Sequence, residues 1–124
     1  MIAADTSSVV AYLQGASGED VEKLDAAFSA GDLMLPPVVI TEILSDPVSA
    51  KMLRVILPEI QMLELTAGYW TRAGQSRLVL KRKGLKAKIA DALIAQSCVD
   101  HDVALITRDT DFRHFVRHCG LKLA

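Results

Sequence analysis

The chain alternates short apolar runs with longer stretches in which apolar residues recur every three or four positions. The short runs have the composition of buried parallel strands, and the longer stretches have the period of helices packed on one face. The expected strands are residues 1–4, 33–35, 60–65, 103–106 and 121–123. The expected helices lie at about residues 9–13, 19–30, 37–44, 49–57, 66–83, 87–101 and 112–116. This alternation predicts an α/β fold with one parallel sheet of about four to five short strands, covered by helices.

Residues at the ends of these segments support the assignment. Pro37 suits the first turn of a helix, and Gly31 suits the end of one. Ser49 and Thr66 are expected to cap the helices that follow them, because a hydroxyl oxygen can accept hydrogen bonds from free N–H groups. The length of 124 residues fits a single domain, 1–124.

Cysteine content and hydropathy indicate where the protein resides. Two cysteines, Cys98 and Cys119, provide no disulfide framework. No basic leader precedes an apolar run, and no apolar run approaches the ~20 residues of a membrane-spanning helix. We therefore expect a cytoplasmic protein that does not enter a membrane.

The net charge of −1 conceals two opposed halves. Residues 1–64 contain ten acids and three bases, whereas residues 65–124 contain five acids and eleven bases. No acid lies between Glu64 and Asp91. The bases in that interval are Arg72, Arg77, Lys81, Arg82, Lys83, Lys86 and Lys88. Such a stretch is often a solvated helix face, but it also suits a polyanionic partner such as RNA.

Acidic residues occur where a parallel sheet binds ligands. Asp5 follows the first expected strand, and Asp109 follows the strand at residues 103–106. Glu42 and Asp91 lie inside otherwise apolar helical segments, where a lone acid is commonly exposed or paired with a base. Carboxylates gathered in one pocket raise each other's pKa, and a bound Mg²⁺ or Mn²⁺ relieves that repulsion. Such an ion also stabilises charge on a phosphodiester, so an acidic pocket beside a basic surface suits a phosphodiesterase.

Four segments together resemble the PIN domain family. They are Asp5-Thr6-Ser7, residues 35–44 around Glu42, residues 89–95 around Asp91, and residues 105–112 around Asp109. Each segment is a weak signal alone, but their order and spacing agree over essentially the whole chain. The length is similar to that of the VapC-type toxins of bacterial and archaeal toxin–antitoxin pairs.

The resemblance implies a PIN-like three-layer αβα sandwich and a Mg²⁺-dependent endoribonuclease, with Mn²⁺ as an alternative metal. It implies that Asp5 and Asp91 are the principal metal ligands and that Glu42 and Asp109 complete the site directly or through water. Asp111 is either a further ligand or a cap of the following helix. The small residues implied to line the pocket are Thr6, Ser7 and Thr107.

The resemblance also implies partners. These are an RNA substrate, held by the seven bases of residues 72–88, a second copy of the chain in a homodimer, and a cognate antitoxin that inserts a C-terminal segment into the groove. Two other functions stay open: a phosphatase or receiver-like domain, and a non-catalytic metal- or protein-binding module. Ser7 stands where the haloacid-dehalogenase type of phosphatase has a second Asp, which disfavours the first of these.

A few other side chains have candidate chemistry. His114 and His118, with Cys119 nearby, have the spacing of a transition-metal site, but a solvated helix end is the commoner reason for such a pattern. Tyr69 and Trp70 are expected to pack in the fold rather than to stack on bases.

Overall fold

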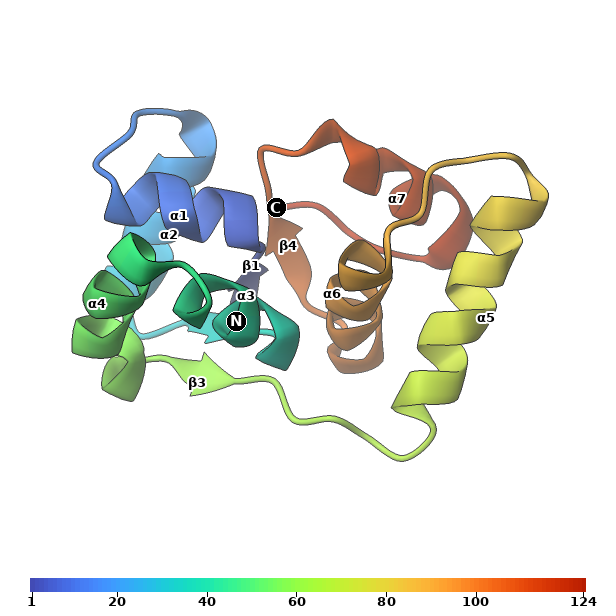
Figure 1. Cartoon of the computed structure of the whole chain (residues 1–124), viewed down its shortest axis with the longest axis horizontal. Coiled ribbons are helices and arrows are strands. Elements are labelled where there is room, and N and C mark those ends of the chain that lie inside the picture. Colours follow the sequence, from blue (N-terminus) through green and yellow to red (C-terminus); the bar gives the residue numbers. More distant parts are fainter.

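A four-stranded parallel sheet forms the centre of the molecule, which we describe from a computed structural model of residues 1–124 (Figure 1). The strands are β1 (Ile2–Ala4), β2 (Leu33–Leu35), β3 (Gln61–Met62) and β4 (Ala104–Ile106). Their order across the sheet is β3-β2-β1-β4. In register, Ala3 of β1 stands between Met34 of β2 and Leu105 of β4. The predicted α/β class and the parallel sheet are therefore confirmed.

Seven α-helices surround this sheet, as a three-layer sandwich requires. They are α1 (Thr6–Leu13), α2 (Glu19–Ser29), α3 (Pro37–Leu44), α4 (Pro47–Ile56), α5 (Tyr69–Arg82), α6 (Ile89–His101) and α7 (Arg113–Cys119). Two short 3₁₀ helices, η1 (Leu57–Glu59) and η2 (Thr110–Phe112), precede β3 and α7. In Figure 1, α4 and α5 lie at opposite ends of the molecule, and α3 and α6 lie between them. None of the helices combines the length and the apolar character needed to cross a lipid bilayer.

The core is mostly aliphatic, and two phenylalanines near the C-terminus join it. Twenty-two buried residues form one connected cluster, which includes Leu35 of β2, Ile43 of α3 and Leu105 of β4. Phe112 and Phe115 anchor η2 and α7 to it, with ring centroids 6.1 Å apart. Burial of these side chains fixes the helices against the sheet and thereby fixes the ends of the strands.

Three local expectations are wrong. Residues 121–123 form no strand, because only a single bridge joins Leu123 to Leu105. The cap of α4 is Asp46 rather than Ser49: its carboxylate accepts a hydrogen bond from the Ser49 N–H at 2.8 Å. Helix α5 begins after Gly68, whose φ of 80° favours glycine, and so Thr66 is not its cap.

The strand order creates a crevice. The chain moves outward from β1 through β2 to β3, and it then returns to place β4 on the other side of β1. The connections therefore diverge at the carboxyl ends of β1 and β4, which is where parallel sheets bind ligands. Asp5 N donates a hydrogen bond to the Ile106 carbonyl at 3.1 Å, so the residues that follow the two strands begin side by side.

Candidate metal centre

Asp5 lies at the base of this crevice, with only 3% of its surface exposed. Its carboxylate caps α1 by accepting a hydrogen bond from the Ser8 N–H at 2.9 Å. It also accepts from the Ser7 hydroxyl at 2.8 Å and from the Thr107 hydroxyl at 2.7 Å. Burial raises the pKa of Asp5, and these hydrogen bonds oppose the rise. The hydroxyls predicted to line the pocket at Ser7 and Thr107 therefore hold this carboxylate in place.

Asp91 lies in the first turn of α6, partly withdrawn from water. Burial raises its pKa to about 6, and the neighbouring charges of Asp109, Asp111 and Asp5 add to that rise, while Lys88 opposes it. The acids that follow β1 and β4 are thus close enough to raise the pKa of Asp91, although Asp5 in particular lies far from it in sequence. The short helices α1 and η2 and the N-terminal end of α6 bring them together.

Three carboxylates meet in a smaller cluster. Asp91, Asp109 and Asp111 each place one oxygen within 4.8 Å of the oxygens of the other two. Asp109 caps η2 by accepting a hydrogen bond from the Asp111 N–H at 2.8 Å. Asp111 is therefore not the cap of the following helix, and its carboxylate lies near those of Asp91 and Asp109 while also pairing with Lys86 at 2.9 Å. We call Asp91, Asp109 and Asp111 the carboxylate cluster.

Glu42 lies at the edge of the site rather than in the carboxylate cluster. It projects from α3 and is exposed, and it accepts a hydrogen bond from the Thr6 hydroxyl at 2.6 Å. Thr6 follows Asp5 directly, so this bond joins α3 to the start of α1. The structure therefore places Glu42 beside the predicted pocket, one residue removed from Asp5.

The donors in this region fit a hard divalent cation. They are carboxylate and hydroxyl oxygens, which suit Mg²⁺ and Mn²⁺ better than softer metals. The pKa of Asp91 is raised to about 6 mainly by burial, and repulsion from the neighbouring carboxylates adds to the rise. A cation bound among these carboxylates would offset both effects. His114, His118 and Cys119 form no comparable group, because the carboxylate cluster is the one set of three candidate ligands that converge.

An ion pair that was not predicted from the sequence supports the Asp5 carboxylate through Ser8. Arg108 binds the carboxylate of Asp20 on α2 at 2.8 Å, and Asp20 also accepts from the Ser8 hydroxyl at 2.8 Å. The Arg108 guanidinium holds the pKa of Asp20 down at about 2. Since the Ser8 N–H binds Asp5, this chain of contacts links α2 to the carboxylate that ends β1. Only the fold reveals it, because Asp20 and Arg108 are 88 residues apart.

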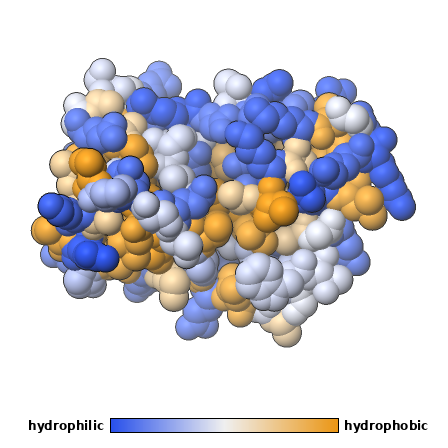
Figure 2. Space-filling model, viewed as in Figure 1, coloured by the Kyte–Doolittle hydropathy of each residue, from blue (hydrophilic) through white to orange (hydrophobic).

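Four of the predicted RNA-binding bases line one cavity next to the carboxylate cluster. The cavity has a volume of about 420 Å³, and we call it the cationic cavity. Its basic residues are Arg77, Lys81, Lys86 and Lys88. Arg82 and Lys83 are exposed near the C-terminal end of α5. Figure 2 shows hydrophilic residues along the upper edge of the molecule, where Figure 1 places the α5–α6 connection and the segment after β4.

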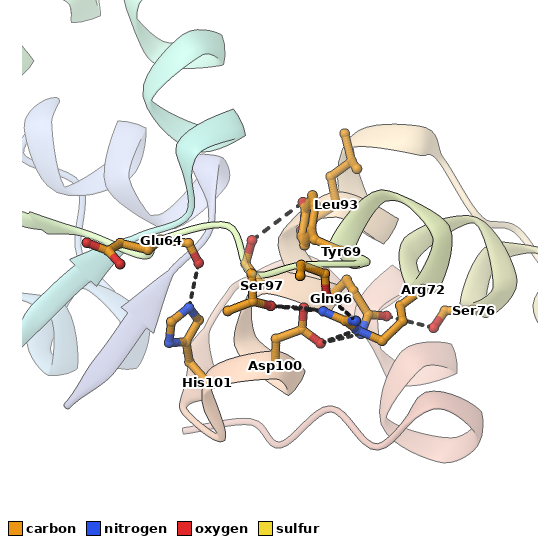
Figure 3. Close-up of polar contacts among 11 residues, drawn as sticks. Glu64, Tyr69, Arg72, Ser76, Leu93, Gln96, Ser97, Asp100 and His101 are labelled. Atoms are coloured by element: carbon orange, nitrogen blue, oxygen red, sulfur yellow. Dashed lines mark hydrogen bonds and ion pairs between the residues drawn. The ribbon is translucent and has the colours of Figure 1, made fainter.

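Arg72 lies elsewhere, in a polar network between α5 and α6 (Figure 3). Its guanidinium makes two hydrogen bonds to Asp100, at 2.7 and 3.0 Å, and Gln96 donates to the same carboxylate at 2.8 Å. Figure 3 also shows the Tyr69 hydroxyl pointing to the Leu93 carbonyl, at 2.7 Å. The predicted RNA contact at Arg72 thus competes with a structural role, since its charge is already paired.

Only one of the two adjacent aromatics packs as predicted. Tyr69 is buried, whereas Trp70 is 66% exposed and meets Tyr69 edge to face at a centroid distance of 5.1 Å. Trp70 lies on a shallow apolar groove of about 270 Å³ between α5 and α6. Ile89 and Leu93 form the opposite wall of this groove, and Arg77 borders both it and the cationic cavity.

Comparisons with known proteins agree with this geometry. The family model described as "PIN domain" matches residues 2–117. No curated protein matches the sequence. Among solved structures, VapBC2 from Rickettsia felis bound to a promoter DNA fragment superimposes with a TM-score of 0.80 at 20% identity, covering 100% of this chain and 98% of that one. DNA-bound VapBC from Salmonella typhimurium gives 0.71 at 18%, covering 100% and 98%. FitAcB from Neisseria gonorrhoeae gives 0.68 at 20%, covering 99% and 96%.

Proposed function

The chain belongs to the PIN domain family, and from this premise we propose that it is a metal-dependent endoribonuclease and the toxin of a toxin–antitoxin pair. The observation that carries the nuclease proposal is the meeting of Asp91, Asp109 and Asp111 near the end of β4, close enough to the buried Asp5 for its charge to act on Asp91. A purely structural role would not require three acids, of which only Asp111 has an ion-pair partner, to be gathered at the ligand-binding edge of the sheet.

In this proposal Asp5 and Asp91 are the principal ligands of Mg²⁺ or Mn²⁺, and Asp109, Asp111 and Glu42 complete the site directly or through water. Held by these residues, a divalent ion would supply Lewis-acid chemistry that activates water and stabilises negative charge on the phosphodiester. The Ser7 and Thr107 hydroxyls orient Asp5, because each donates a hydrogen bond to its carboxylate. In this proposal one of Glu42 and Asp109 orients the attacking water.

The cationic cavity supports RNA as the substrate. One of its four bases, Lys86, contacts Asp111 of the carboxylate cluster, so phosphates bound in the cavity would lie near the bond that is cleaved. Arg82 and Lys83 extend the positive surface along the end of α5. Arg72 would contribute little, because its guanidinium is bound to Asp100.

The toxin role rests on the solved structures that the chain is similar to. VapBC2 and VapBC are toxin–antitoxin complexes, and the chain matches almost the whole length of the matched chain in each. We propose that this chain is one domain over residues 1–124, forms a homodimer, and is neutralised by a cognate antitoxin. Its antitoxin and its RNA would both meet it in the cytoplasm.

Cleavage of RNA by the purified protein tests this proposal. The wild type is expected to cut single-stranded RNA with Mg²⁺ or Mn²⁺ and to lose activity in EDTA. Asp91→Asn is expected to lower the rate by about 100-fold or more, since loss of a metal ligand removes several kcal/mol of transition-state stabilisation. Asp102→Asn is the matched control, because Asp102 is exposed at the far end of α6 and binds Lys122. Equal rates for the wild type and Asp91→Asn would disprove the assignment of the site.

A further inference from the structure

Lys86 lies between the carboxylate cluster and the cationic cavity. Its ammonium group is 2.9 Å from the Asp111 carboxylate, and it belongs at the same time to the lining of the cavity. The Asp111 carboxylate lies within 4.8 Å of those of Asp91 and Asp109, so the ammonium of Lys86 stands beside the whole cluster, and the charges of Asp109 and Asp91 add to the rise in its pKa that Asp111 causes. Lys86 is therefore a cation held against the acids that we propose as metal ligands.

This contact is suited to being broken. The Lys86 side chain is 57% exposed, and exposed ion pairs contribute little to stability. Lys86 belongs to the connection between α5 and α6, outside both helices, so breaking its ion pair would break no hydrogen bond within either helix. A divalent cation carries twice the charge of an ammonium group and is bound by several carboxylates at once. Such an ion would therefore displace Lys86 from Asp111.

The cationic cavity offers the displaced ammonium a second anionic partner. Arg77 is fixed there by a hydrogen bond from its Nε to the Ala87 carbonyl at 2.8 Å, which leaves its terminal nitrogens for a ligand. Lys81 and Lys88 line the same space, and no carboxylate does. A phosphate group entering this cavity would meet four cations and no carboxylate, with Lys86 as the cation that contacts the carboxylate cluster.

We propose that Lys86 is a displaceable counter-cation: it holds Asp111 in the metal-free protein, leaves when a divalent cation binds the carboxylate cluster, and then binds a phosphate group of the substrate in the cationic cavity. This inference rests on the proposed metal site and adds an order of events to it. Phosphate binding is weak until metal has bound, so metal and substrate bind cooperatively through one side chain.

Titration of Mg²⁺ tests the displacement step. In protein with ¹³C-dimethylated lysines, the Lys86 resonance, assigned by its absence in Lys86→Met, is expected to move along the same Mg²⁺ binding curve that calorimetry measures. Lys86→Met is expected to bind Mg²⁺ about 2- to 5-fold more tightly, the range for loss of one partly exposed ion pair. Lys88→Met is the control, because it removes a charge from the same cavity without breaking an ion pair, and its effect should be smaller. A Lys86 resonance that stays still while Mg²⁺ binds would overturn the proposal.

Inorganic phosphate tests the second step. Phosphate is expected to shift the Lys86 resonance only when Mg²⁺ is present, and Mg²⁺ is expected to strengthen phosphate binding several-fold more in the wild type and in Lys88→Met than in Lys86→Met. Equal strengthening in all three proteins would refute the role of Lys86. Neither titration involves RNA cleavage, so the absence of nuclease activity and the absence of Lys86 displacement are separate results.

Discussion

Asp91 occupies the first turn of α6 with its carboxylate partly buried among other acids. A position in the first turn favours a negative charge, because the helix dipole is positive there. Burial and the charges of Asp109, Asp111 and Asp5 nevertheless raise its pKa to about 6. At neutral pH the metal-free protein therefore carries a charge at Asp91 that the fold disfavours.

Asp91→Asn is accordingly expected to stabilise the metal-free protein. The folded-state pKa of about 6 lies above the value of about 4 for an unfolded aspartate. The cost of the charge is therefore absent below about pH 4, grows up to about pH 6 and is complete at higher pH. We expect denaturation in EDTA at pH 7.5 to show an increase of about 1 kcal/mol in the unfolding free energy, after solvent screening, and no increase at pH 4. A variant less stable than the wild type at pH 7.5 would contradict this.

Asp20 shows the opposite behaviour. The Arg108 guanidinium lowers the pKa of Asp20 to about 2. The charged carboxylate therefore stabilises the fold fully at every pH above about 4, the pKa of an unfolded aspartate. Asp20→Asn is expected to lower the unfolding free energy by about 1 kcal/mol at pH 7, and the difference should vanish as the pH falls from about 4 to about 2. Glu22→Gln, an exposed change in the same first turn of α2, is the control and should have little effect.

Among the elements, the helices were easier to predict than the strands. A helix such as α6 repeats its apolar positions over 13 residues, whereas β3 has only two residues and both are exposed. The apolar pattern over residues 60–65 predicted a longer strand than β3. Beyond Met62 only one hydrogen bond continues the pairing, from the Leu63 N–H to the Leu35 carbonyl at 3.0 Å. Residues 121–123 failed as a strand for a related reason, since a single bridge to Leu105 is all that the edge beyond β4 provides.

The candidate site was predictable where it depends on strand ends and not where it depends on tertiary packing. Asp5 and Asp109 follow strands that the hydrophobic pattern identifies. The separation of Glu42 from the carboxylate cluster, and the support of Asp5 through Ser8, depend on how α1, α2 and α3 pack. The sequence also could not show which basic side chains are already paired, because the partner of Arg72 is Asp100, on a different helix.

The ion pair between Arg72 and Asp100 helps to hold α5 against α6. The Asp100 side chain is 8% exposed and receives both hydrogen bonds of the Arg72 fork. Arg72→Ala leaves this carboxylate without its charged partner, so we expect the unfolding free energy to fall by about 1–3 kcal/mol. Arg82→Ala, an exposed change on the same helix, should alter it by less than about 0.5 kcal/mol. Chemical denaturation at pH 7 measures both, and equal effects would mean that the Arg72 contact contributes nothing.

In the whole molecule, the acidic and basic charges that the sequence divides between its two halves are divided instead between two neighbouring sites. The acidic first half supplies Asp5, and the basic second half supplies both the carboxylate cluster and the cationic cavity. The two surfaces lie side by side and are joined by Lys86. A net charge of −1 therefore conceals a compact pairing of acids for a metal with bases for a polyanion.

The proposed homodimer requires a surface that a second copy can cover, and the groove around Trp70 is the best candidate. Trp70 and Ile89 are 66% and 61% exposed, and large apolar side chains exposed together commonly mark an interface. Since Trp70 is the only tryptophan, its fluorescence reports on this groove alone. We expect light scattering to detect a dimer whose dilution shifts the Trp70 emission to longer wavelength, and we expect Trp70→Glu to be monomeric. Val55→Glu, which changes an apolar residue that is even more exposed, on α4 at the other end of the molecule, should leave the dimer intact. A dimer that persists in Trp70→Glu and dissociates in Val55→Glu would place the interface on α4 instead.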